Sequence, residues 1–225
     1  MKTYKIIAFA LLALLFAGCV ENKVEPEYVS AGTLYRDFLG NVSFVVDTAG
    51  GNPELTLHIT NKSAFQDIED GYRFILFYTI DKKINEKSMD VSYTGFTSMK
   101  NDIIHKVRLD AEVPDSLGND PITMEDLYIS HDYLTLNFSV TMLNYVDHYC
   151  YFVKDENKQK QDTVVVNLHH NANGDTSGQT YYGYLTAPIL EFKDSSKDYI
   201  CLEIVSEVIG KKPVSKFLTY KFVRE

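Results

Sequence analysis

The sequence predicts an all-β protein in two parts, a small closed barrel followed by a β-sandwich. Apolar and polar residues alternate over 55–60, 133–140 and 163–168, as they do in half-buried strands. The chain also contains 16 Tyr and 13 Phe, which favour strands over helices. No stretch keeps helical spacing for three turns, so helix is expected only as single turns within 63–70 and 123–127.

The first part, residues 29–112, is expected to be the barrel. Turn-forming residues separate five or six short strands, at Asn41, 50–53, 70–71, 81–90 and 99–102. Residues 72–80, YRFILFYTI, are apolar on both faces, as in a central or barrel strand. Short strands packed into about 80 residues suit a closed, OB-like barrel better than an open sheet, whose edges need protection.

The second part, residues 113–225, is expected to be an antiparallel β-sandwich. Residues 113–121, VPDSLGNDP, form the densest group of turn formers and mark the expected boundary. About seven strands follow, at a spacing typical of a sandwich. They are expected near 126–130, 133–143, 145–154, 162–170, 181–192, 198–208 and 216–223.

The N-terminus has the pattern of a lipoprotein signal peptide, residues 1–18. Two lysines precede the apolar run Ile6–Phe16, which is shorter than the roughly 20 residues needed to span a bilayer as a helix. The segment Phe16-Ala17-Gly18-Cys19 resembles a bacterial lipobox, with Phe16 where Leu is usual. We therefore expect Cys19 to carry the lipid and residues 19–28 to form a flexible tether. The alternative is a secreted protein in which Cys19 is incidental.

The charge balance limits the classes of partner. Removing residues 1–18, with Lys2 and Lys5, changes the net charge from −9 to −11. An acidic chain lacks the basic surface needed for nucleic acid, and it would not bind anionic lipid electrostatically. The acidic tether resembles the surface-export signal of Bacteroides-type lipoproteins. We expect a cell-envelope protein anchored to the outer membrane through its lipid, facing the periplasm or the outside.

The stretch LHHNANGD, residues 168–175, is the strongest apparent candidate for a metal site. His169 and His170 are adjacent in a predicted strand, so their side chains point to opposite faces and cannot bind one ion together. His170 continues an apolar face, whereas His169 is expected to be exposed. Asn171, Asn173 and Asp175 have the alternate spacing of ligands in a calcium loop, but Gly174 comes too early and no helices flank it. Asn173-Gly174 is instead typical of a tight turn, and no metal or cofactor is expected.

No catalytic motif stands out. The chain has no G-x-S-x-G, H-E-x-x-H, phosphate-binding Gly-rich loop or C-x-x-C. The remaining histidines are scattered over separate predicted strands, so an enzyme is not expected. Cys150 and Cys201 are candidates for a disulfide, which the compartment outside the cytoplasm would permit. The alternative is two separate thiols buried in strands.

Three segments carry a family resemblance. Gly118-Asn119-Asp120-Pro121, the strand YLTLNF at 133–138 and His170–Asp175 occur in this order and spacing. Together they resemble the NigD-like lipoproteins of Bacteroides-type bacteria, and Asn101–Val107 is similar to the end of that family's first domain. The resemblance implies an OB-like domain followed by a β-sandwich, in agreement with the partition above. It implies an association with bacteriocin-type gene clusters but no defined activity.

Two functions are therefore carried forward. One is a binding or interaction module for a glycan or an envelope protein, with Tyr181, Tyr182 and Tyr184 as weak candidates for ligand stacking. The other is a structural or accessory subunit of an envelope or bacteriocin-associated complex. A concave groove lined by Tyr would favour a ligand, whereas a flat apolar patch of several hundred Å² would favour a protein partner.

The lipidation site can be tested by metabolic labelling. We expect radioactive or alkyne-tagged palmitate to label the wild-type protein and not Cys19→Ala, because the thiol is the attachment point. Equal labelling of both proteins would show that Cys19 is not lipidated.

Overall fold

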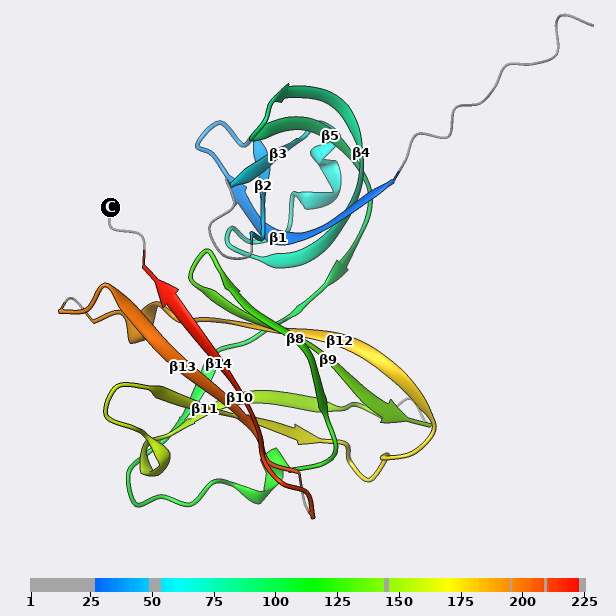
Figure 1. Ribbon diagram of the computed structural model, residues 1–225. Helices are drawn as coiled ribbons and strands as arrows, with labels where there is room; N and C mark the ends of the chain where they lie inside the picture. The colour runs from blue at the N-terminus through cyan, green and yellow to red at the C-terminus, as the bar shows by residue number, and fades with distance from the viewer. Residues whose placement is uncertain (1–26, 49–53, 144–145, 195, 209, 223–225) are drawn as a thin grey trace, which may run out of the picture.

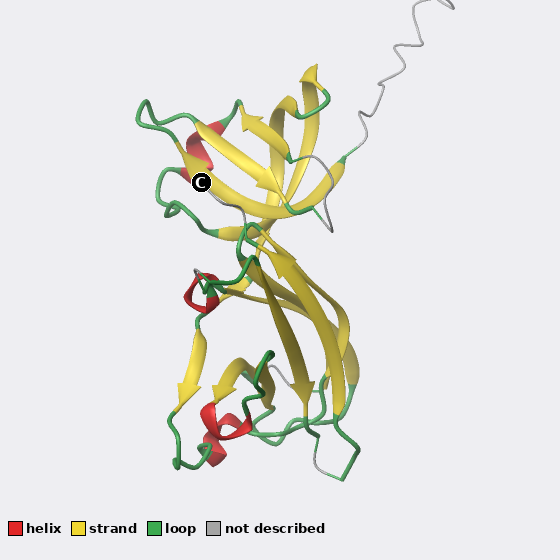
Figure 2. Cartoon of the chain, turned by 60° about the vertical axis from the view of Figure 1, so that its left-hand side comes forward, coloured by secondary structure: helices red, strands yellow, loops and turns green. Residues whose placement is uncertain are grey.

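The computed structural model describes residues 27–48, 54–143, 146–194, 196–208 and 210–222. Two β lobes lie one above the other (Figure 1), and within the described ranges helix occurs only as short 3₁₀ turns between strands (Figure 2). The all-β prediction, with a barrel followed by a sandwich, is confirmed. The signal peptide, Cys19 and most of the tether lie outside the described residues. Among the described helices, none has the length and apolar character needed to cross a bilayer.

The upper lobe is a five-stranded closed barrel in the order β1-β2-β3-β5-β4, the strand order of an OB-fold. Its strands are β1 (Tyr28–Arg36), β2 (Val42–Val46), β3 (Leu55–Ile59), β4 (Arg73–Asn85) and β5 (Ser88–Ser98). The short helix η1 (Lys62–Phe65) inserts Phe65 into the barrel, where it is fully buried against Phe74, Tyr93 and Phe96. The single turn expected within 63–70 is therefore present.

The lower lobe packs two sheets face to face. One has the order β14-β13-β11-β10-β7 and the other β6-β12-β9-β8. The strands are β6 (Lys100–Asn101), β7 (Ile104–Val107), β8 (Thr123–Ser130), β9 (Tyr133–Met142), β10 (Tyr149–Asp155), β11 (Val164–Asn171), β12 (Gln179–Pro188), β13 (Tyr199–Ser206) and β14 (Val214–Lys221). The short helices are η2 (Asp115–Leu117), η3 (Glu156–Lys158) and η4 (Leu190–Phe192). Apolar side chains from both sheets, including Leu136, Phe152 and Leu168, form one core.

Three details differ from the sequence expectations. The change of lobe falls between β5 and β6, near Met99, and not at 112/113, because β6 and β7 belong to the sheets of the sandwich. Three strand pairs in the sandwich are parallel, namely β7–β10, β11–β13 and β6–β12, so the lobe is only partly antiparallel. The helical turn expected within 123–127 is wrong, because these residues extend along β8 beside β9.

The two lobes meet at a buried arginine. Arg73, the first residue of β4, has no exposed surface, and its guanidinium satisfies all five N–H groups. It donates to both carboxylate oxygens of Asp47, at 3.0 and 2.5 Å, and to the Thr33 hydroxyl at 2.8 Å, all within the upper lobe. It also donates to the hydroxyls of Thr135 and Thr186, each at 2.9 Å, in the lower lobe. The cation therefore ties β4 of the barrel to β9 and β12 of the sandwich.

Further contacts surround this pair. Tyr128 donates its hydroxyl to Asp47 at 2.9 Å, and the Tyr133 ring lies against the guanidinium, 4.8 Å from centroid to carbon. Burial and the neighbouring carboxylate raise the pKa of Tyr128, so its hydroxyl stays a donor. Asn101 pairs with the backbone of Arg73 through both atoms of its amide. A buried ion pair is tolerated only when its remaining donors and acceptors are satisfied, as they are here.

Removing one charge of this pair should destabilise the protein. We expect Asp47→Asn to lower the free energy of unfolding by about 3–5 kcal/mol, because Arg73 would remain buried without a counter-charge. Urea unfolding of the purified protein measures the change. The control is Glu86→Gln, which removes the exposed Lys83–Glu86 pair and should have no measurable effect. Equal stability of Asp47→Asn and wild type would contradict the role of the pair.

Candidate functional site

The histidines of LHHNANGD lie on opposite faces of β11, as predicted. His170 points into the sandwich and is 1 % exposed. His169 points to the other face, but it is also buried, at 7 % exposed, so the expectation of an exposed His169 is wrong. Its Nδ1 donates to the carbonyl of Gly118 at 3.0 Å, because the loop before β8 covers this face. Neither side chain is available to a ligand.

The two segments of the family motif pack against each other. Asp120 donates its backbone N–H to the carbonyl of His170, and its carboxylate accepts from the N–H of Ala172 at 2.8 Å. Gly118 adopts φ 70° and ψ 166°, a region open almost only to glycine. A β-carbon there would lie 2.5 Å from the carbonyl oxygen of His170. The motif therefore holds the loop on the end of β11, a structural role.

Asn173 and Gly174 form the predicted turn. Both have positive φ, 49° and 83°, and Asp175 donates its N–H to the carbonyl of Ala172 at 2.9 Å. These are the features of a type I′ turn. The Asp175 carboxylate accepts from the N–H of Leu143 at the end of β9, so it fixes the connection between sheets. Across the described residues, His, Cys, Asp and Glu form no group of three or more suited to a metal.

His170 belongs to a buried histidine pair. Its Nδ1 donates to the carbonyl of Pro121 at 3.0 Å, which leaves Nε2 of the neutral ring as an acceptor. His148 donates to that atom from Nδ1, also at 3.0 Å. Burial lowers the pKa of His170, and the nearby His148 lowers it further. Burial likewise lowers the pKa of His169. The lowered pKa values favour the neutral rings of His169 and His170, which serve as packing and hydrogen-bonding groups.

The proposed disulfide is not present. Both Cys150 and Cys201 are free thiols. Cys150 points into the core opposite His170, near the end of β11, whereas Cys201 lies beside the start of the same strand on the outer face. The two sulfurs are thus separated by the length and the thickness of the sheet. Burial raises the pKa of the Cys150 thiol to about 12, so it is an inert core residue.

The candidate tyrosines of β12 do not form one cluster. Tyr182 and Tyr184 share the outer face of their sheet, and Tyr182 is 70 % exposed. Tyr181 points to the opposite face, since successive strand residues alternate. None of the three lines the hollows that run beside β7.

Three hollows lie near β7, and we call them together the β7 groove. Residues of β7 line the first two, whereas the third lies on the other side of η4. The first lies where the lobes meet, has a volume of about 500 Å³ and is lined by Tyr72 and Tyr133 together with Glu69, Asp70 and Asp102. The second, about 510 Å³, shares Ile103, His105 and Pro188 with the first and adds Leu190. The third, about 860 Å³, begins beyond η4, where Phe192 lines it.

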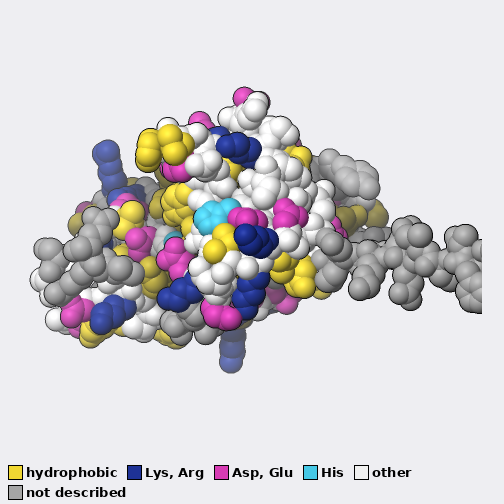
Figure 3. All heavy atoms as spheres, turned by 90° about the horizontal axis from the view of Figure 1, so that it is seen from above, with side chains coloured by type: hydrophobic (Ala, Val, Ile, Leu, Met, Phe, Trp, Pro, Cys, Tyr) yellow, Lys and Arg dark blue, Asp and Glu magenta, His cyan; other side chains and the backbone are white. Residues whose placement is uncertain are grey.

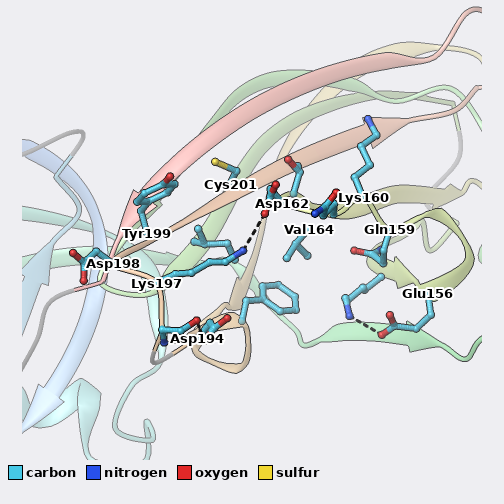
Figure 4. A pocket seen from close by; sticks show the side chains of 16 residues that line it. Glu156, Gln159, Lys160, Asp162, Val164, Asp194, Lys197, Asp198, Tyr199 and Cys201 are labelled. Atoms are coloured by element: carbon cyan, nitrogen blue, oxygen red, sulfur yellow. Dashed lines mark hydrogen bonds and ion pairs between the residues drawn. The ribbon is translucent and has the colours of Figure 1, made fainter.

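Figure 4 shows the third hollow from close by. Phe192 and Val164 line it, together with charged side chains from the loops before β11 and β13. Lys154 pairs with Glu156 at 2.6 Å, and Lys197 pairs with Asp162 at 3.3 Å. Over the whole groove, eight carboxylates stand against four lysines. The groove is therefore acidic and suits a cationic or neutral ligand better than an anionic one.

Apolar side chains inside the groove are exposed. Ile103 is 61 % and Leu190 is 53 % exposed, and both line the second hollow. Elsewhere, the barrel end seen from above shows only small apolar groups separated by charged side chains (Figure 3). On that face there is no broad flat apolar patch among the described residues. The concave surface partly lined by Tyr is therefore a better candidate than the barrel end.

The comparisons with known proteins establish the family. The model of the NigD-like C-terminal beta sandwich domain matches residues 105–216. The chain belongs to the NigD-like family. The matched segment begins within β7, which agrees with the observed lobe boundary near Met99 and not with a boundary at residue 113. A search of the curated proteins gives no match to this NigD-like chain.

Solved structures share the fold at low identity. A protein of unknown function from Bacteroides vulgatus has a TM-score of 0.69 at 16 % identity, covering 88 % of this chain and 92 % of its own. A NigD-like immunity protein from Bacteroides caccae has a TM-score of 0.60 at 16 % identity, with coverages of 88 % and 97 %. A candidate lipoprotein from Bacteroides fragilis has a TM-score of 0.61 at 13 % identity, with coverages of 88 % and 99 %. These likenesses define the two-lobed fold.

Sequence reasoning missed the groove and the junction beside it. The available signal was Arg73, a lone charge at the start of the apolar strand YRFILFYTI. A cation in such a strand needs a buried counter-charge, which Asp47 supplies from a distant segment. No local pattern places Ile103 and Leu190 in one hollow, because that proximity depends on both sheets.

The buried histidines predict how the NigD-like protein responds to acid. Since their folded-state pKa lies below the ordinary value of about 6.5, the unfolded chain binds more protons as the pH falls. We expect the free energy of unfolding to be steady above about pH 6.5 and to decrease below it. The double variant His169→Gln/His170→Gln should lose most of this slope, while the exposed-site control His58→Gln should keep it. Stability that rises on acidification would contradict this.

Proposed function

We propose that this NigD-like protein is a non-enzymatic lipoprotein of the cell envelope that binds a partner in the β7 groove. The observation that carries the proposal is the pair of joined hollows along β7, with exposed Ile103 and Leu190 in the second and a third hollow beyond η4. Exposed apolar side chains inside a concave surface are typical of binding sites. The interlobe wall of the groove is held by the Arg73 junction through Thr186 and Tyr133, so this part of the site is formed before a ligand binds.

Several features agree with a location in the envelope. The lipobox-like segment ending at Cys19 supports attachment to the outer membrane through a lipid. Two similar structures are described as an immunity protein and a candidate lipoprotein, and these descriptions agree with a non-enzymatic envelope role. The histidines that drew attention to a catalytic or metal site are engaged in packing. Binding is the activity that the exposed residues support.

Site-specific photo-crosslinking tests the groove. A photoreactive phenylalanine analogue at Ile103 or Leu190 should yield a discrete adduct when the cells that make the protein are irradiated. The matched control is Phe217 on β14, which is 69 % exposed but lies outside the groove. We expect no such adduct from the control position. Adducts from Phe217 alone, or from none of the three positions, would contradict binding in the groove.

A further inference from the structure

We propose that the occupant of the β7 groove is an extended, basic polypeptide segment that pairs with the free edge of β7. This inference rests on the proposed function, since it names the class of partner for the same groove. Three observations carry it: the free strand edge, the continuity of the first two hollows along β7 and the charge of the walls.

The first observation is the strand edge. β7 is the last strand of its sheet and pairs with β10 alone among the described strands. Along Ile104–Val107, alternate backbone N–H and C=O groups therefore point away from β10, toward the side of the sheet that has no strand. Extended peptides bind such edges by main-chain hydrogen bonds. A compact sugar or small molecule would leave this row of donors and acceptors unmatched.

The second observation is the shape of the groove. The first and second hollows are continuous, because they share Ile103, His105 and Pro188, and the third begins at Phe192, on the other side of η4. Lys106 of β7 pairs with Glu191 of η4 across the middle of this path. Both side chains are partly exposed, so the pair is weak and can part when a ligand enters. Two hollows that join along β7 suit an extended chain.

The third observation is the chemistry of the walls. Ile103 and Leu190 offer apolar contact for one side chain of the guest. Glu69, Asp70 and Asp102 line the interlobe end, and of these Asp102 already pairs with Lys100 at 3.6 Å, so Glu69 and Asp70 are the carboxylates that make this end acidic. Because β7 is only four residues long, its hydrogen bonds are few, and side-chain anchors must supply the remaining affinity. The expected guest has an apolar residue next to Lys or Arg.

The experiment selects ligands from a phage-displayed library of random ten-residue peptides, with the purified protein as the immobilised target. Enriched peptides should contain an apolar residue near a basic one and should bind the wild-type protein. Ile103→Ser/Leu190→Ser should weaken their Kd at least about tenfold, as expected for the loss of central apolar anchors. Both positions are exposed, so the variant should fold normally, and Phe217→Ser is the matched control that should bind like wild type.

Backbone methylation distinguishes strand pairing from side-chain binding alone. Versions of a selected peptide are made with N-methyl groups on odd or on even amides. One series should lose binding and the other should keep it, because only alternate amides face β7. Equal binding of both series, no enriched peptide, or specific binding to a glycan array instead would overturn the inference. Photo-crosslinks at Ile103 would still stand in those cases, so failure here is distinct from failure of the proposed function.

Discussion

The structure depends on the burial of one cation between two lobes. Arg73 leaves water completely, which is costly, and Asp47 with three threonine hydroxyls satisfies every N–H of its guanidinium. Arginine suits this position because its planar group can form two parallel bonds to a carboxylate and still donate to other partners. If the lobes separated, the guanidinium of Arg73 would lose its hydrogen bonds to the hydroxyls of Thr135 and Thr186. The junction is therefore held in one arrangement.

The same junction shapes the groove. Thr186, Asn101 and Tyr133 all contact Arg73, and all three line the interlobe hollow. The side chains that hold the cation thus also form one wall of the candidate binding site. From that wall the groove continues along β7, whose edge the sheet leaves open. Stability and binding surface arise from the same contacts, so a change at the junction is expected to alter both.

The most conspicuous sequence motif has a packing role. Gly118–Pro121 and His170–Asp175 lie far apart in the chain, yet they meet through main-chain and side-chain hydrogen bonds. Residues of this kind look reactive in a sequence because His, Asn and Asp also serve in catalysis and metal binding. Here their polar atoms form the hydrogen bonds that the backbone of a strand end and a loop would otherwise lack. The motif marks the family through its architecture.

The sequence by itself determined the all-β class, the barrel and sandwich, the opposite faces of His169 and His170 and the Asn173-Gly174 turn. Each of these follows from local spacing or from backbone preferences that neighbouring residues define. Tertiary structure alone decided the lobe boundary near Met99, the separation of Cys150 from Cys201, the burial of His169 and the groove beside β7. These depend on which strands pair across long stretches of chain. Pairing is set by the packing of the whole core, and no short segment encodes it.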